Sequence, residues 1–293
     1  MHSMLSAQVT DVEESLRTVT ADSLDGWKKG AILNVGMAQT SLTNWAAGGE
    51  SSIAINGLLS AFANLTKGRT NWDNTLDIGY GSVKKGKGDF IKTDDKIDLS
   101  SKLGYDAFEK WNYAAFLSFK TQMTNGYNES GEEVISKLLA PGYILAAAGL
   151  DYKPNDIFSA FIAPLTTKIT LVMDDSLSAA GAFGVETGNS ARSELGGYVR
   201  MAFSKEILKN ISLSTKIDLF SNYLNNPQDI DVNWEALLTL KANKYISTTL
   251  ATHLIYDKDI LIPVESDAEG NTIRSEPRVQ FKEMLSVGLT VTF

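Results

Sequence analysis

The chain has 293 residues, no cysteine and a formal net charge of −8. The absence of cysteine excludes disulfides, thiolate metal sites and a catalytic thiol. The acidic balance argues against a nucleic-acid partner, because such binding rests on basic surfaces. The two histidines, His2 and His253, are too few for a histidine-based metal site, so we expect neither a metal nor a cofactor.

The hydrophobic content of 43% is ordinary for a soluble protein. The longest apolar stretch, 138–150, is interrupted by Pro141 and Gly142 and is shorter than the roughly 18 residues that a spanning helix needs. A membrane β-barrel has an average composition too, because only every second strand residue faces lipid. Composition therefore excludes a helical membrane protein but allows a barrel.

Alternating apolar and polar residues fill about twelve segments of the chain, as expected for strands with two different faces. The segments are 31–38, 52–65, 70–83, 97–106, 111–122, 144–152, 157–172, 195–203, 211–219, 232–240, 246–256 and 279–293. In the seventh segment Pro164 cannot donate to a ladder, which predicts a bulge. The pattern predicts an all-β fold, a single up-and-down antiparallel transmembrane β-barrel over residues 26–293. Residues 1–25 are expected to be a signal remnant or a flexible periplasmic tail.

The predicted connections alternate in length. Short turns are expected at 67–69, 108–110, 153–156, 205–209 and 242–244, and long loops at 40–49, 84–93, 125–137, 174–190, 222–230 and 257–276. Bacterial outer-membrane barrels have short periplasmic turns and long external loops. The sequence thus predicts an outer-membrane location with both termini in the periplasm.

Large aromatic residues occur near both ends of the predicted strands, as in the girdles of membrane barrels. Near the short turns are Trp72, Tyr105, Trp111, Tyr113, Tyr152, Phe203 and Phe293, and near the long loops are Tyr80, Tyr223, Trp234, Tyr256 and Phe281. A soluble β-sandwich also has alternating strands, but it has no reason to carry aromatics at both ends. A soluble lipocalin-like binder is retained as the last alternative.

The polar faces of the strands carry many charged residues of both signs. The predicted lumen-lining residues are Asp77, Asp98, Lys102, Asp106, Lys120, Lys168, Glu194, Arg200, Lys216, Asp218, Glu235, Lys241, His253 and Lys282. Opposite charges on neighbouring strands can pair across a sheet. Two interpretations follow: a salt-bridged interior that fills a narrow barrel, or a polar pore.

His253 falls on the predicted inward face of its strand. An outer-membrane hydrolase of the lipase or esterase type would need its catalytic groups at the lipid boundary, so we expect no catalytic residues and no enzymatic activity. That hydrolase is retained as an alternative. The acidic segments 257–269 and 128–133 lack the spacing of a calcium loop, and we expect them to carry solvated charge.

One compact motif, Asn44, Trp45, Gly48 and Gly49, falls in the first long loop. Together with Trp27, Gln39, 52–56, 72–74, 79–81 and 92–96, it resembles a Bacteroidota outer-membrane β-barrel family known as domain of unknown function 3078. The resemblance extends from Trp27 to Phe293. It implies a barrel and implies no activity, because that family has no assigned function.

We therefore expect a porin-like channel, or a structural or accessory barrel in an envelope complex. The last segment resembles the signal read by the barrel-assembly machinery. Its apolar residues are spaced by twos or fours: Phe281, Leu285, Leu289, Val291 and Phe293. The expected partners are outer-membrane lipid, that machinery and an envelope complex, with no nucleic acid.

Overall fold

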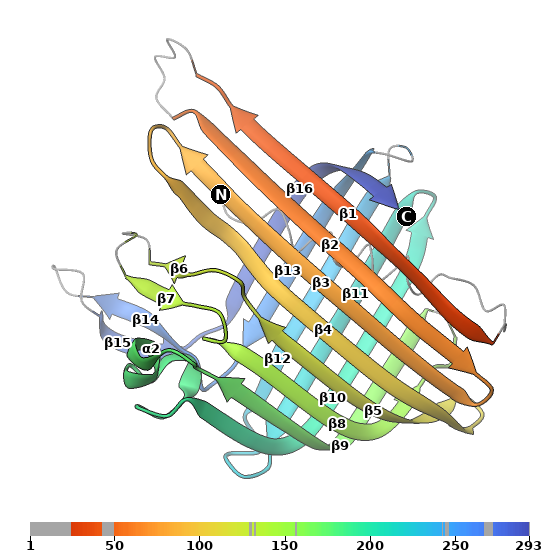
Figure 1. Cartoon of the computed structure of the whole chain (residues 1–293). Coiled ribbons are helices and arrows are strands. Elements are labelled where there is room, and N and C mark those ends of the chain that lie inside the picture. Colours follow the sequence, from red (N-terminus) through yellow and green to blue (C-terminus); the bar gives the residue numbers. More distant parts are fainter. Residues whose placement is uncertain are drawn as a thin grey trace.

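A computed structural model describes residues 25–42, 50–128, 131, 133–155, 157–241, 243, 246–266 and 272–292. The predicted N-terminal segment before residue 25, the loop motif from Asn44 to Gly49 and the last residue, Phe293, lie outside the described residues. The rest of the chain is dominated by long antiparallel strands (Figure 1).

The barrel consists of twelve strands, as predicted. They are β1 (Gly26–Thr40), β2 (Ser52–Lys67), β3 (Thr70–Lys85), β4 (Phe90–Phe108), β5 (Trp111–Thr121), β8 (Gly142–Tyr152), β9 (Phe158–Leu171), β10 (Ala191–Leu208), β11 (Ile211–Asn222), β12 (Ile230–Lys241), β13 (Ile246–Tyr256) and β16 (Gln280–Thr292). Each pairs with its neighbours along the chain, and β1 pairs with β16 to close the ring. The predicted up-and-down barrel is confirmed.

The longer connections contain small elements of their own. Two hairpins, β6 (Gly126–Tyr127) with β7 (Val134–Ser136) and β14 (Leu261–Ser266) with β15 (Thr272–Pro277), lie in two of the loops. A third loop holds the short helix α2 (Asp175–Ala179) and the 3-10 turn η1 (Ala182–Gly184). All lie at the long-loop end of the barrel (Figure 1). No helix among the described residues is long and apolar enough to cross a membrane.

The predicted bulge at Pro164 is present. The ladder between β9 and β10 shifts between Gly196 and Tyr198, and the ladder between β8 and β9 shifts between Ala148 and Leu150. Both shifts fall beside Pro164, which cannot donate to either neighbour. Gly149 fits this place, since a Cβ there would overlap the carbonyl of Ile162.

Two predicted connections are wrong. The turn expected at 205–209 is mostly strand, because β10 continues to Leu208 and only 209–210 connect it to β11. Residues 84–93 were expected to be a loop, but β3 continues to Lys85 and β4 begins at Phe90, so that only 86–89 connect them. This part of β4 lies beyond the end of β5, because the β4–β5 ladder stops at the pair Ile97–Thr121. Here the β5 ladder no longer covers β4, while β3 stays paired with β2 up to Ser52–Lys85. The consecutive residues Phe90 and Ile91 are both exposed, so the alternation of a barrel strand is lost.

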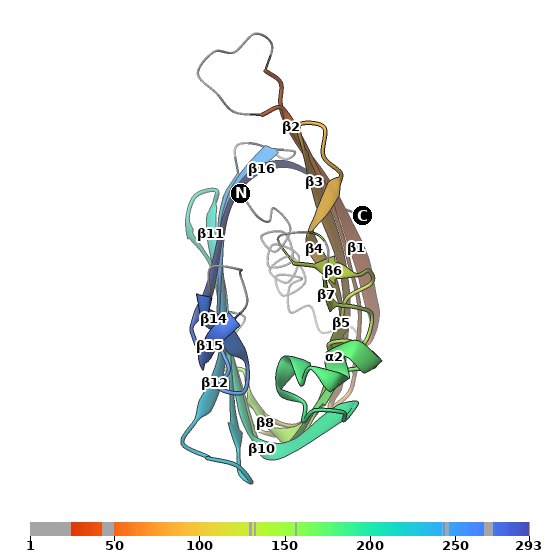
Figure 2. The same ribbon diagram turned by 90° about the vertical axis from the view of Figure 1, so that its left-hand side faces the viewer.

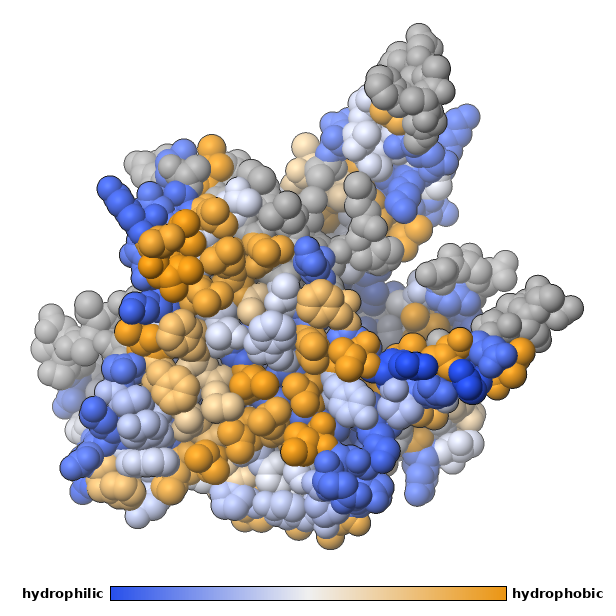
Figure 3. Space-filling model, turned by 180° about the vertical axis from the view of Figure 1, so that it is seen from behind, coloured by the Kyte–Doolittle hydropathy of each residue, from blue (hydrophilic) through white to orange (hydrophobic). Residues whose placement is uncertain are grey.

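The outer surface of the barrel is apolar. On the face seen in Figure 3, apolar side chains form a broad patch that polar side chains border. Aromatic rings gather near the short turns, where Trp27 lies 5.6 Å from Trp72 and Trp111 lies 4.7 Å from Tyr152, centroid to centroid. Tyr80 and Phe281, 41% and 57% exposed, lie toward the long-loop end. Soluble proteins rarely expose so large an apolar surface.

The ring of strands is elongated in cross-section (Figure 2). The inward positions of β5 and β8 to β11 form one apolar cluster inside this ring. It consists of Ala114, Phe116, Ala147, Phe161, Ala163, Tyr198 and Phe220. The core of the molecule therefore lies in one corner of the lumen.

Candidate functional site: the charged lumen

The structure places most of the predicted lumen residues inside the ring. Four are buried, namely Asp77, Glu194, Lys216 and Asp218. Seven are partly buried, namely Asp98, Lys102, Lys120, Lys168, Arg200, Glu235 and His253. Asp106 and Lys241 lie exposed at the short-turn end of their strands. Lys282 is in β16, and its side chain lies outside the described part of the chain.

The charges near mid-height are arranged in pairs on neighbouring strands. Arg200 on β10 binds Asp218 on β11 through two contacts, Nε to Oδ1 at 2.6 Å and a terminal guanidinium nitrogen to Oδ2 at 2.8 Å. Tyr198 donates its hydroxyl to the same carboxylate at 2.7 Å. A bidentate arginine pair of this kind fixes both side chains in orientation.

Two further pairs extend this network around the lumen. Lys120 on β5 lies 3.2 Å from Asp98 on β4, and Lys216 on β11 lies 3.4 Å from Glu235 on β12. Lys120 also interacts electrostatically with Glu235, although four strands separate β5 from β12. Charges from both long walls of the flattened ring therefore meet at this level.

Aromatic side chains fill the corner beside this network. Phe116, Phe161 and Tyr198 have ring centroids 6.1 to 6.3 Å apart. The guanidinium of Arg200 lies 4.9 Å from the centroid of Phe116, a cation–π contact. These rings were not predicted from the sequence, although the same period of two places Phe116 and Tyr198 on the inward face.

The opposite wall, formed by β1 to β4, carries shorter side chains on its inward face. Thr75 and Ser100 hydrogen-bond to each other at 2.7 Å, and Ser60 donates to Asp77. Gly36 and Gly81 both stand beside Asn56, which lies between them on β2. The lumen is thus asymmetric in its aromatic cluster, which lies on one side only, whereas charged residues such as Asp98 and Lys102 are also present on the β1 to β4 side.

A second ion cluster lies at the long-loop end. Lys168 on β9 is 2.6 Å from Asp231 on β12, 3.2 Å from Asp257 and 3.6 Å from Glu194. Because β10 and β11 lie between β9 and β12, the contact between Lys168 and Asp231 crosses the lumen at one narrow end of the elongated cross-section. Arg192 adds pairs with Glu194 at 3.0 Å and with the loop residue Asp259 at 2.7 Å.

This cluster corrects one expectation about the loops. The segment 257–269 was expected to carry solvated charge, but Asp257 is only 9% exposed and binds Lys168. A polar cavity of about 150 Å³ adjoins the cluster and is lined by Glu194, Asn222, Asn225, Asn226, Asp229, Asp231, Lys258 and Asp259. The sequence contained no signal for this arrangement, since the partners come from four separate segments.

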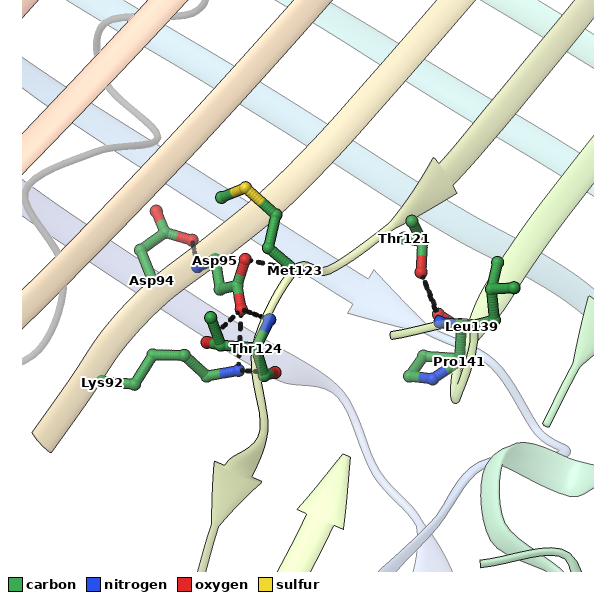
Figure 4. A network of polar contacts seen from close by, with 8 residues as sticks. All are labelled: Lys92, Asp94, Asp95, Thr121, Met123, Thr124, Leu139 and Pro141. Atoms are coloured by element: carbon green, nitrogen blue, oxygen red, sulfur yellow. Dashed lines mark hydrogen bonds and ion pairs between the residues drawn. The ribbon is translucent and has the colours of Figure 1, made fainter. Parts of the chain in front are cut away.

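The loop after β5 is anchored to β4 by one carboxylate (Figure 4). Asp95 accepts hydrogen bonds from the backbone N–H groups of Met123 and Thr124 at 2.8 and 2.7 Å, and from the Thr124 hydroxyl at 2.7 Å. Lys92 lies 3.0 Å from this carboxylate and also donates to the carbonyl of Thr124. The run 92–96, noted above as part of the family resemblance, thus holds a loop at the long-loop end of the barrel.

His253 faces inward and contacts Asn233, with Nε2 2.6 Å from Oδ1. Its neighbour across the β12–β13 ladder is Glu235, a member of the mid-height network. His253 therefore lies beside two polar residues of β12, Asn233 and Glu235. Among the described residues, no three His, Asp or Glu side chains converge as metal ligands.

Comparison with known proteins supports the resemblance described above. Residues 37–127 match the family model described as protein of unknown function (DUF3078). The match confirms the resemblance to this family over a shorter range than Trp27 to Phe293. No curated protein matches the chain.

Two solved structures have a similar overall shape. One is the translocator domain of autotransporter NalP from Neisseria meningitidis, with 10% identity, coverage of 98% of this chain and 96% of that one, and a TM-score of 0.39. The other is the COG4313 outer membrane channel from Pseudomonas putida F1, with 10% identity, coverage of 94% and 100%, and a TM-score of 0.40.

Proposed function

We propose that this protein is a bacterial outer-membrane barrel that acts as a narrow, porin-like channel for small polar solutes and has no enzymatic role. The observation that carries the proposal is the asymmetric lumen. The aromatic cluster fills one corner, while the wall from β1 to β4 carries polar and charged inward residues such as Thr75, Ser100 and Asp98. A polar path beside a filled corner limits the size of a solute that can pass.

The membrane location is supported by the apolar exterior. The charged side chains described above lie inside the ring and not on its apolar exterior, as insertion into lipid requires. The connections at one end are short, such as 68–69, 109–110 and 209–210, and the loops at the other end hold the hairpins and α2. In an outer membrane the short-turn end, and with it both termini of an even-stranded barrel, faces the periplasm.

Conductance in planar lipid bilayers tests the channel. We expect small unitary steps, and larger ones for Lys120→Ala, because this side chain reaches toward carboxylates of the opposite wall. The matched control is Lys241→Ala, which removes an exposed lysine at the short-turn end and should leave conductance unchanged. Absence of steps from folded protein would overturn the channel.

The second candidate is an accessory barrel in an envelope complex. The specific observation for it is the hairpin of β3 and β4 beyond the end of β5, where Phe90 and Ile91 are 53% and 57% exposed. Site-specific photo-crosslinking from Ile91 in cells tests this role. A discrete crosslinked band at Ile91, together with electrical silence, would favour the accessory role.

The proposed lack of enzymatic activity rests on His253, which contacts Asn233 inside the barrel. Ester hydrolysis abolished by His253→Ala would overturn it. Assignment to Bacteroidota rests on the family resemblance, and sequencing the source genome checks it.

A further inference from the structure

The ring closes between β1 and β16 through only three residue pairs along the described parts of both strands. These are Ile32 with Thr292, Leu33 with Val291 and Asn34 with Thr290. On its other side β1 pairs with β2 at every position from Gly26 to Thr40. The ladder between β1 and β16 therefore stops in the middle of β1.

Beyond this point no strand in the described part of the chain pairs with this edge of β1. Residues 35–40 have no partner in β16 within the described part of the chain. In a strand, every second residue directs its N–H and C=O toward a given neighbour, so this edge presents polar backbone groups. Outward from the same edge, Val35 and Met37 expose 60% and 68% of their side chains. The polar backbone groups along this edge of β1 thus lie next to the apolar outer surface formed by Val35 and Met37.

A buried acceptor lies immediately inside this edge. Asn56 on β2 is 6% exposed, and its Oδ1 has no hydrogen-bond donor among the described residues. Its neighbour on β1 is Gly36, and a Cβ at Gly36 would overlap the Asn56 amide. Glycine therefore makes room for the amide next to the seam. A buried carbonyl oxygen without a donor costs free energy unless a ligand or water supplies one.

We propose that the seam between β1 and β16 binds a single-chain amphiphile that enters from the bilayer and carries a hydrogen-bond donor in its head group. The head donates to Asn56 Oδ1 and to free carbonyls of β1, and the chain lies against Val35 and Met37. An ammonium or hydroxyl head group has the required donor. The site is independent of whether the lumen conducts.

Paired cysteines test the open seam, because the chain has no cysteine of its own. Leu33→Cys with Val291→Cys joins a pair that the structure contains. Val35→Cys with Leu289→Cys is the matched pair two residues further along, with the same facing in an antiparallel ladder. We expect the first disulfide to form readily and the second at least about tenfold more slowly, because bridging requires Cα atoms within about 7 Å. Equal rates would overturn the open seam.

Binding of two probes to the full chain in lipid nanodiscs tests the ligand class. Dodecylammonium and dodecyltrimethylammonium share chain and charge, but only the first has N–H donors. We expect the first to bind about tenfold more tightly, the effect of one hydrogen bond to a buried acceptor. Asn56→Leu should abolish this preference. Asn64→Leu, on the same strand and face, should retain it, because Asn64 Oδ1 already accepts from the Asn74 N–H.

Binding of neither probe, or a preference that survives in Asn56→Leu, would overturn the site. If Asn56→Leu fails to fold, Asn56→Asp keeps an acceptor in place and must keep the preference. Loss of the preference in folded Asn56→Asp would also overturn the proposal.

Discussion

Arg200 and Asp218 face each other across the β10–β11 ladder and form a bidentate ion pair inside the barrel. Phe116 covers the guanidinium from β5, and Tyr198 donates to the carboxylate. The pair joins the charged network to the aromatic corner of the lumen. Its removal should therefore affect the stability of the whole wall.

Replacement of Arg200 by Met should lower the free energy of unfolding by about 3 kcal/mol, because it leaves the buried Asp218 carboxylate without its cation. Urea unfolding in detergent, followed by electrophoretic mobility, measures the loss. The double variant Arg200→Met/Asp218→Asn should recover part of it. Arg274→Met, at a side chain that is 58% exposed, is the control and should change stability little. An equal loss of unfolding free energy in Arg200→Met and in Arg274→Met would contradict a specific role of the Arg200–Asp218 pair.

Replacement of Asp95 by Ala should release the loop after β5. The N–H groups of Met123 and Thr124 lose their acceptor, which costs roughly 1 to 3 kcal/mol when such groups stay buried. We expect faster proteolysis within 122–141 while the barrel remains folded. Asp89→Ala, at an exposed position of the neighbouring turn, is the control. Unchanged cleavage in Asp95→Ala would count against the anchor.

The loop that holds α2 should loosen at low pH. The Lys137 ammonium and the backbone N–H groups of Leu177 and Ser176 donate to Asp174, which lowers the pKa of this carboxyl below its ordinary 3.8. A carboxyl with a lowered pKa contributes stability above its unfolded pKa, and that contribution is lost as the pH falls through the folded pKa.

Amide hydrogen exchange measures this effect at Ser178 and Ala180, whose N–H groups bond to the carbonyls of Asp174 and Ser176. After correction for intrinsic rates, we expect less protection below about pH 3 than at pH 6. Asp174→Asn should show little pH dependence. Equal protection of the wild type at both pH values would contradict the prediction.

Deletion of Phe293 should lower insertion into the outer membrane severalfold, because the terminal strand resembles the signal of the assembly machinery. Residues Leu285, Leu289 and Val291 belong to β16, but their side chains and all of Phe293 lie outside the described part. Quantification of the heat-modifiable, folded form in membranes provides the measurement. Phe90→Ala, at the external hairpin, is the control. Normal levels of the truncated protein would disprove this role.

Much of the barrel could be predicted because strand periodicity is a local property. Each residue of β5, for example, either faces lipid or faces the lumen, and the alternation of Tyr113, Ala115 and Leu117 with Asn112, Ser118 and Lys120 records that choice. The prediction of a loop at 84–93 was wrong, because consecutive residues such as Phe90 and Ile91, both exposed, do not alternate as in a barrel strand. The bulge at Pro164 was predictable because proline lacks a donor.

The sequence by itself determined the number of strands, their inward faces and the alternation of turns and loops. Only the tertiary structure decided which charges pair, because Lys168 and Asp231 belong to strands that meet only when the ring flattens and bends. It also decided that aromatic rings fill one corner and that the β1–β16 ladder stops at Asn34. Period two tells which way a side chain points, but the distance to the opposite wall depends on how the whole ring closes.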